Sequence, residues 1–121
     1  MDYIVKYITE KLITDGVPAT KYVVPQNYDI AAADFKAVTV NAMSDEGEGS
    51  KDTVGHEDKT HTIRVDIFTK MAADKDVVYY QVVDTIVSIT EYSIKYSGKV
   101  DFYDDTNDMY HQVIEYLVKE K

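Results

Sequence analysis

Four aspartates near the end of the chain are the first candidates for chemistry. Asp101, Asp104, Asp105 and Asp108 lie within one short stretch, and clustered carboxylates are candidate ligands for Ca²⁺. An EF-hand loop also requires a glycine at its sixth position and a glutamate at its twelfth. No register through the segment DFYDDTNDMYHQ supplies both. We therefore expect a solvated turn between two strands here, and no metal.

The three histidines are the second candidates, because imidazole is a common zinc ligand. His56 and His61 are five positions apart on a segment without helical periodicity, and His111 is remote in the sequence. This spacing matches no helical metal motif. The expectation is therefore three surface histidines.

Signals for catalysis are missing from the sequence. There is no cysteine and no Gly-x-Ser-x-Gly turn, and the segment GEGSKDT lacks the Gly-Lys-Ser/Thr order of a phosphate-binding loop. That segment is also acidic, so it would repel a phosphate. Carboxylates are too numerous for spacing alone to single out an acid/base pair. The sequence predicts that the protein is not an enzyme and uses no cofactor, and we assign no catalytic, cofactor-binding or metal residue.

Length and charge narrow the class of protein. The 121 residues favour one domain, 1–121, and the net charge of −9 with a single arginine, Arg64, argues against binding nucleic acid through its phosphates. No run approaches the roughly 20 apolar residues that span a bilayer, and residues 1–15 carry scattered charges, unlike a signal peptide. We expect a soluble, unprocessed, intracellular protein with no membrane partner.

Two helices are predicted. In residues 1–15 an apolar stripe runs through Ile4, Ile8 and Leu12, flanked by Val5 and Ile13, and Gly16 ends it. Residues 74–92 are too long for a typical strand, so we predict a helix that starts at an Asp74 N-cap and covers the sheet. Its core face would carry Tyr79, Val82, Val83, Ile86 and Thr90. Residues 17–35, with two prolines, are expected to form an extended connector.

Four strands complete the expected fold. Alternation predicts strands over 37–43 and from Thr62 onward, the latter with Ile63, Val65 and Ile67 on one face and Thr62, Arg64, Asp66 and Phe68 on the other. A turn at Gly98 would lead into a third strand with Val100 and Phe102 inward. Residues 109–118 fit a helix or a strand by periodicity, and the polar turn DDTND before them favours a strand. The fold class is α+β, an antiparallel or mixed four-stranded sheet packed by two helices.

A long acidic segment, 44–60, separates the first two strands of this pattern. Hairpin loops usually need about 2 to 5 residues, whereas this insert has seventeen, with six acidic and two basic residues. It has too few apolar side chains to pack against a core. We expect a protruding hairpin loop that reaches another molecule.

Taken in order, the helix DYIVKYITEKLITDGVP, the strand AVTVNAM, the long insert, THTIRVDIFTKMAADKDVVYYQVVDTIVSI and DMYHQVIEYLV resemble the tail terminator, or minor capsid (tail completion), proteins of long-tailed bacteriophages. The segment IRVDIFTK followed by an Asp-led helix is the most suggestive part. The resemblance covers nearly the whole chain, and it favours a strand for residues 109–118.

The resemblance implies a virion structural protein: a hexameric ring that caps the tail tube, stops its polymerisation and offers a surface for head-tail joining. The expected partners are other copies of this chain, the tail tube protein and a head-completion or neck protein. DNA would pass through the ring lumen without specific binding, past acidic walls that do not hold phosphates. The expected location is the head-proximal end of the tail, and the host cytoplasm during assembly.

The insert corresponds to the variable hairpin loop of that family, so its charged residues are the predicted partner contacts. These are Asp45, Glu46, Glu48, Lys51, Asp52, Glu57, Asp58 and Lys59. An alternative function is a small acidic adaptor, or an inhibitor that mimics nucleic acid with its carboxylates. A mimic would carry ordered acids across a rigid face, whereas many acids here lie in a glycine-bearing loop.

Overall fold

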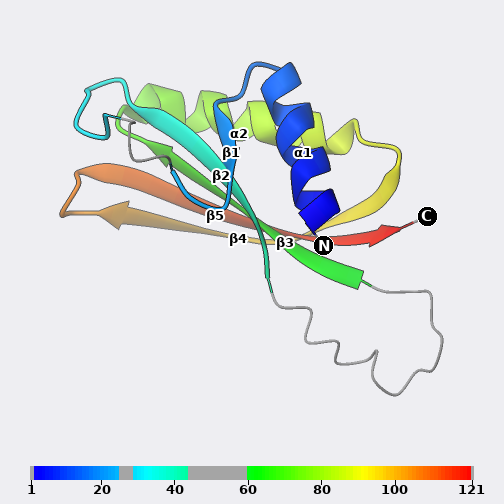
Figure 1. Cartoon of the computed structure of the whole chain (residues 1–121). Helices are drawn as coiled ribbons and strands as arrows, with labels where there is room; N and C mark the ends of the chain where they lie inside the picture. The colour runs from blue at the N-terminus through cyan, green and yellow to red at the C-terminus, as the bar shows by residue number, and fades with distance from the viewer. Residues whose placement is uncertain (1, 25–28, 44–59, 121) are drawn as a thin grey trace.

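In the computed structural model, two helices lie on one side of a five-stranded sheet (Figure 1). The structure describes residues 2–24, 29–43 and 60–120. The strand order is β1-β2-β3-β5-β4; β1 runs parallel to β2, and the other neighbours are antiparallel. The predicted α+β class and the two helices are confirmed, but the sheet is mixed and has five strands rather than four.

Helix α1 (Asp2–Thr14) confirms the first predicted helix. Ile4, Ile8 and Leu12 are buried against the sheet, since a spacing of four returns them to one face. Ile13 is exposed, so the apolar stripe is narrower than predicted. The helix ends at Gly16, whose φ of 88° lets the chain reverse while Val17 N–H donates to the Leu12 carbonyl.

Strand β1 (Ala19–Lys21) was not predicted. It lies in the expected connector, directly after Pro18, and pairs Ala19 with Val38. Three residues are too few to display the period-two alternation on which strand prediction depends. A short parallel strand at the edge of the sheet therefore leaves no pattern in the sequence.

Strands β2 (Lys36–Ala42) and β3 (Thr60–Thr69) form the predicted antiparallel pair. Val38 lies opposite Ile67 and Val40 opposite Val65, and all four side chains are fully buried. The pairing continues to the ends of both strands, where Met43 N–H donates to the Thr62 carbonyl at 2.9 Å. Residues 44–59 of the insert lie outside the described residues.

Helix α2 (Ala72–Val87) begins earlier and ends earlier than predicted. Met71 is the N-cap and makes no side-chain cap hydrogen bond, so the predicted Asp74 N-cap is wrong. Asp74 instead lies in the first turn, where its carboxylate is 3.9 Å from the Lys36 ammonium. Val78, Val82 and Ile86 are buried, and Ile89 joins the core just beyond the helix.

Strands β4 (Tyr92–Asp104) and β5 (Met109–Glu120) form a hairpin closed by the polar turn that the sequence predicted. The strand prediction for residues 109–118 is confirmed. Gly98 is not a turn, because it lies inside β4 at an irregularity in the pairing with β5 between Tyr96 and Gly98. Before this bulge Ile94 and Tyr96 share the helix-covered face with Val118 and Tyr116, their partners on β5.

The bulge reverses the alternation of β4. Val100 and Phe102 pair with Val113 and His111 on the face away from the helices, and each is 52% exposed. The predicted inward orientation of these two side chains is therefore wrong. An extra residue in one strand shifts every later side chain to the opposite face.

Two hydrophobic clusters hold the layers together. The main one lies between the helices and the sheet, and the other lies on the opposite face, which we call the open face. In this second cluster Phe35, Ala37 and Met109 are buried, with Phe68 packed against them, so the segment before β2 covers one end of the open face. None of the helices that the structure describes is long and apolar enough to cross a membrane.

Candidate functional site

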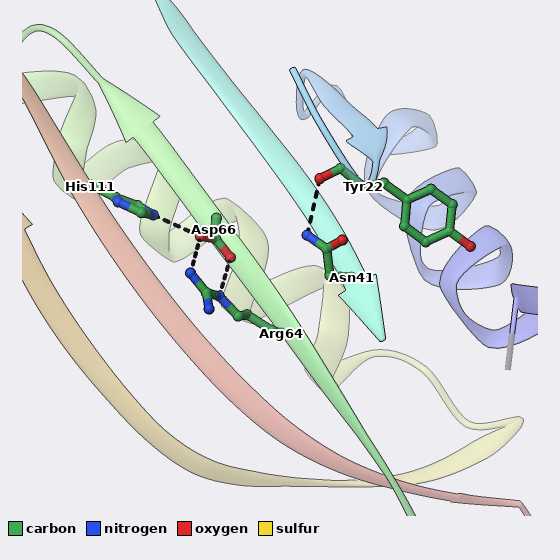
Figure 2. Close-up of polar contacts among 5 residues, drawn as sticks. All are labelled: Tyr22, Asn41, Arg64, Asp66 and His111. Carbon is green, nitrogen blue, oxygen red and sulfur yellow. Dashed lines mark hydrogen bonds and ion pairs between the residues drawn. The ribbon is translucent and has the colours of Figure 1, made fainter. Parts of the chain in front are cut away.

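The main polar network of the described residues lies on the open face of β3. Arg64 and Asp66 are two positions apart on this strand, so both side chains point to the same side of the sheet. The Arg64 Nε and Nη2 atoms donate to the two oxygens of Asp66 at 2.8 and 2.9 Å (Figure 2). This is a bidentate fork, the strong geometry for an arginine and a carboxylate.

His111 brings a third group to this carboxylate from the neighbouring strand β5 (Figure 2). Its Nε2 atom lies 2.7 Å from Asp66 Oδ2. The imidazole ring stacks on Phe68 with ring centres 4.4 Å apart, and Phe102 contacts it from β4 at 5.6 Å. Phe68, His111 and Phe102 are direct cross-strand partners, so one row of rings crosses three strands.

Burial of Asp66 explains why it needs two partners. Only 7% of its side chain is exposed, compared with 39% of Arg64 and 22% of His111. A buried carboxylate is costly unless it is paired and hydrogen-bonded. The hydrogen bonds to Asp66 raise the pKa of the Arg64 guanidinium above its ordinary value, against the opposing effect of burial. The arginine is therefore committed to an internal partner.

Asn41 continues the polar row toward β2 and β1. It lies opposite Arg64, and its Nδ2 donates to the Tyr22 carbonyl at 3.2 Å (Figure 2). Tyr22 follows β1 with a φ of 71°, and its own N–H donates to the Val40 carbonyl. These bonds attach the segment after β1 to β2.

This arrangement is suited to fixing the register of β3 with β5. An Asp-His pair can orient a general base, but such a base also needs a nucleophile or substrate proton within hydrogen-bond reach. The cross-strand neighbours of His111 on this face are two phenylalanines. The single arginine is paired, so it offers no fork for a phosphate.

The acidic turn uses its carboxylates within the protein. Asp104 Oδ1 accepts the backbone N–H groups of Thr106 and Asn107 at 3.0 and 3.2 Å, and its Oδ2 accepts Asn107 Nδ2 at 2.9 Å. The hydrogen bonds from Asn107 lower the pKa of Asp104. Asp108 accepts a hydrogen bond from the Tyr103 hydroxyl, and Asp101 pairs with Lys99. Within the described residues no group of three or more potential ligands could hold a metal ion.

His61 and His111 lie on opposite faces of the sheet. His61 is buried on the helix-covered side of β3, opposite Val118, with its Nε2 3.7 Å from a Glu120 carboxylate oxygen. His111 is on the open face, and His56 lies outside the described residues. The expectation of surface histidines is therefore wrong for His61. This residue is the first of the alternating β3 side chains that point toward the helices.

An apolar cavity of about 410 Å³ lies where α2 leaves part of β4 and β5 uncovered. Burial raises the pKa of the Tyr116 hydroxyl at its base, with weaker contributions from Tyr79 and Tyr96. The lining is Tyr79, Val83, Ile86, Val87, Ile89, Ile94, Tyr96 and Tyr116. The helical spacing of Tyr79, Val83 and Ile86 indicated an apolar face, but the cavity depends on where α2 ends, which the sequence did not reveal.

Sequence reasoning also missed the network around Asp66. The opposite charges of Arg64 and Asp66 at a strand spacing of two were a usable signal for their contact. The third member, His111, depends on the pairing of β3 with β5. The predicted partner contacts of the insert lie outside the described residues: Asp45, Glu46, Glu48, Lys51, Asp52, Glu57, Asp58 and Lys59.

No protein-family model matches the chain, and no curated protein matches it. The class defined by the structure is an α+β domain with two helices on one face of a mixed sheet.

Proposed function

We propose that this chain is a tail terminator of a long-tailed bacteriophage, which forms a hexameric ring on the last tail tube subunits, stops tube growth and offers a surface for head-tail joining. The proposal rests on the resemblance of the ordered segments described above. The order of helix, strand, insert, strand, helix and closing hairpin in the structure is compatible with it.

The observation that carries the proposal is the paired base of the insert. Ala42 and Ile63 are cross-strand partners, and Met43 bonds to Thr62, so both ends of segment 44–59 are attached to a rigid antiparallel ladder. A charged segment anchored in this way is suited to contact a neighbouring subunit or the tube. This supports an assembly protein over an enzyme.

Charge supports the same proposal. The chain carries −9, and the hydrogen bonds of its single arginine go to Asp66. A ring with such walls would let DNA pass without binding its phosphates. Replacement of several lumen acids by lysine should then slow genome ejection.

The test is electron microscopy of particles assembled without this chain. Overlong tails, or tails that fail to join heads, support termination. Normal tails joined to heads refute it. Native mass measurement adds a second readout: a hexamer, or a monomer that forms rings only on tail tubes, fits the proposal, whereas a stable monomer bound to a DNA-processing enzyme favours the acidic mimic.

Two variants distinguish an effect of the acidic residues of the insert from an effect of the total negative charge of the protein. Replacing Asp45, Glu46 and Glu48 by their amides should weaken ring formation on tubes. Amide replacement of three exposed helical acids, Glu10, Asp76 and Asp84, removes the same charge and is the control, which should leave ring formation unchanged. Equal behaviour of the two variants would remove the insert from the proposed interface.

A further inference from the structure

Strand β4 is the long edge of the sheet. It has thirteen residues, and among the described strands it pairs only with β5. The opposite edge, β1, has three residues and directly follows Pro18. An exposed edge of this length is a template for another strand. Strand addition is therefore expected at β4 rather than at β1.

Lys95 and the bulge at Tyr96/Gly98 protect the first half of this edge, but after the bulge the edge lacks much of the usual protection against such pairing. Four of its large apolar side chains are about half exposed: Tyr96, Val100, Phe102 and Tyr103. Lysines commonly protect an edge, but Lys99 is drawn back onto the protein. Its ammonium lies 3.1 Å from Asp101 Oδ1 and 4.6 Å from the ring centre of Tyr79 on α2.

The register with β5 fixes the faces of the segment after the bulge. Gly98, Val100 and Phe102 lie on the open face, and Lys99 and Asp101 lie on the helix-covered face. The charged pair thus has one basic and one acidic member placed symmetrically about Val100. A sequence with this symmetry is complementary to itself when it runs antiparallel.

We propose that two copies of this chain pair through β4, antiparallel, about a two-fold axis at Val100. Lys99 then lies opposite Asp101 of the second copy, and the same ion pair forms again on the other side of the axis. Gly98 lies opposite Phe102 of the second copy, where an aromatic ring covers the missing side chain. Val100 meets its own copy on the axis.

Charge selects this register over its neighbours. An axis at Lys99 places two lysines opposite each other, and an axis at Asp101 does the same with two aspartates. Like charges directly opposite are destabilising in a sheet. An axis at Gly98 would place Ser97, inside the bulge, in the ladder, whereas an axis at Phe102 would pair Asp101 with Tyr103.

The surroundings of β4 leave room for a second sheet. Helix α2 packs mainly on β3, and the apolar cavity opens between α2 and β4. Val87 and Tyr96 at this opening are exposed and would be partly covered by the second copy. The pairing is isologous, whereas ring closure needs a heterologous contact, so this inference does not rest on the proposed tail function.

Single charge reversals and their mixture provide the test. Lys99→Asp and Asp101→Lys should each be monomeric by sedimentation, because each places like charges across the axis. An equimolar mixture of the two variants should form dimers again, because the aspartate introduced in one variant then faces the lysine introduced in the other. Native mass measurement should find one chain of each variant in these dimers. The wild type should be dimeric in the absence of tail tubes, where the ring proposal by itself predicts a hexamer or a monomer.

Matched controls carry the same charge changes elsewhere. Lys6→Asp and Asp76→Lys, both at exposed helical positions, should remain dimeric. Val100→Lys, at an exposed position on the axis, should be monomeric and keep its circular dichroism spectrum. A monomeric wild type, or reversals whose mixture stays monomeric, would overturn the proposal. A wild-type hexamer that both charge reversals leave unchanged would overturn the β4 pairing and would still agree with the proposed ring.

Discussion

The imidazole of His111 and the carboxylate of Asp66 meet at 2.7 Å although the two residues are 45 positions apart in the sequence. They belong to β5 and β3, the central pair of the sheet. Arg64 holds the same carboxylate from the other side with two hydrogen bonds. A one-residue slip between these strands would break the contact with His111, whereas Arg64, on the same strand as Asp66, would keep its two hydrogen bonds. The contact with His111 is therefore the part of the network that depends on their register.

Replacement of Arg64 by alanine should lower the free energy of unfolding by roughly 1–3 kcal/mol, because Asp66 loses two charge-assisted hydrogen bonds while staying buried. The partial exposure of Arg64 places the loss toward the lower end. Urea denaturation at neutral pH measures it. In a double-mutant cycle with Asp66→Ala, the two effects should be non-additive by more than about 0.5 kcal/mol, and simple additivity would contradict the coupling.

Two valines on α2 offer a matched comparison of core and surface. Val82 is fully buried and Val77 is 55% exposed. Val82→Ala removes two buried carbons and leaves a cavity, so unfolding should become easier by roughly 2 kcal/mol. Val77→Ala should stay within about 0.5 kcal/mol. Thermal or urea unfolding of both variants measures the difference. Equal losses of unfolding free energy would show that the Val82 face of α2 is not packed in the core.

The Asp104 turn should make stability depend on pH in the acid range. Hydrogen bonds from Asn107 and Thr106 lower the pKa of Asp104 below its ordinary value of 3.8. Its stabilising contribution is therefore complete above that ordinary value and is lost as the pH falls through the lowered folded-state pKa. The difference in unfolding free energy between wild type and Asp104→Asn should shrink from pH 6 to pH 2. A constant difference would show that ionisation of Asp104 is not involved.

Tyr7 and Glu91 should titrate as a pair. The Tyr7 hydroxyl donates to the Glu91 carboxylate, which raises the pKa of Tyr7 to about 12 and lowers that of Glu91. Absorbance titration should show one tyrosine fewer near pH 12 in Glu91→Gln, because its pKa returns toward 10.0. Replacement of the exposed Glu10 by glutamine is the control and should leave the titration unchanged.

The elements that the sequence predicted correctly bury one face over many residues. Ile4, Ile8 and Leu12 in α1, and Ile63 and Val65 in β3, repeat at the helical and strand periods, which tertiary contacts then preserve. The sequence did not reveal where α2 ends and β4 begins, because residues 74–92 combine high strand propensity with a helical spacing of apolar residues. The helix ends at Val87, and pairing with β5, a tertiary contact, makes the chain a strand from Tyr92 onward.

Two features of the open face were not predicted: the outward orientation of the β4 side chains, which has a local cause, and the network around Asp66, which depends on contacts distant in sequence. The bulge near Gly98 reverses the alternation, so Val100 and Phe102 face outward. No hydrophobic pattern signals one extra residue in advance. For Asp66, the approach of Arg64 follows from their spacing, whereas the contact with His111 follows only from the register of β3 with β5.

The strand order also determines which contacts must wait during folding. The β4–β5 hairpin and α2 form from residues close in sequence, but β3 and β5 can pair only after the chain closes a loop, since even Thr69 and Tyr110 are 41 positions apart. Loop closure costs entropy before the contacts compensate for it. We therefore expect the β4–β5 hairpin, closed by the Asp104 turn, to form before β3 docks onto β5.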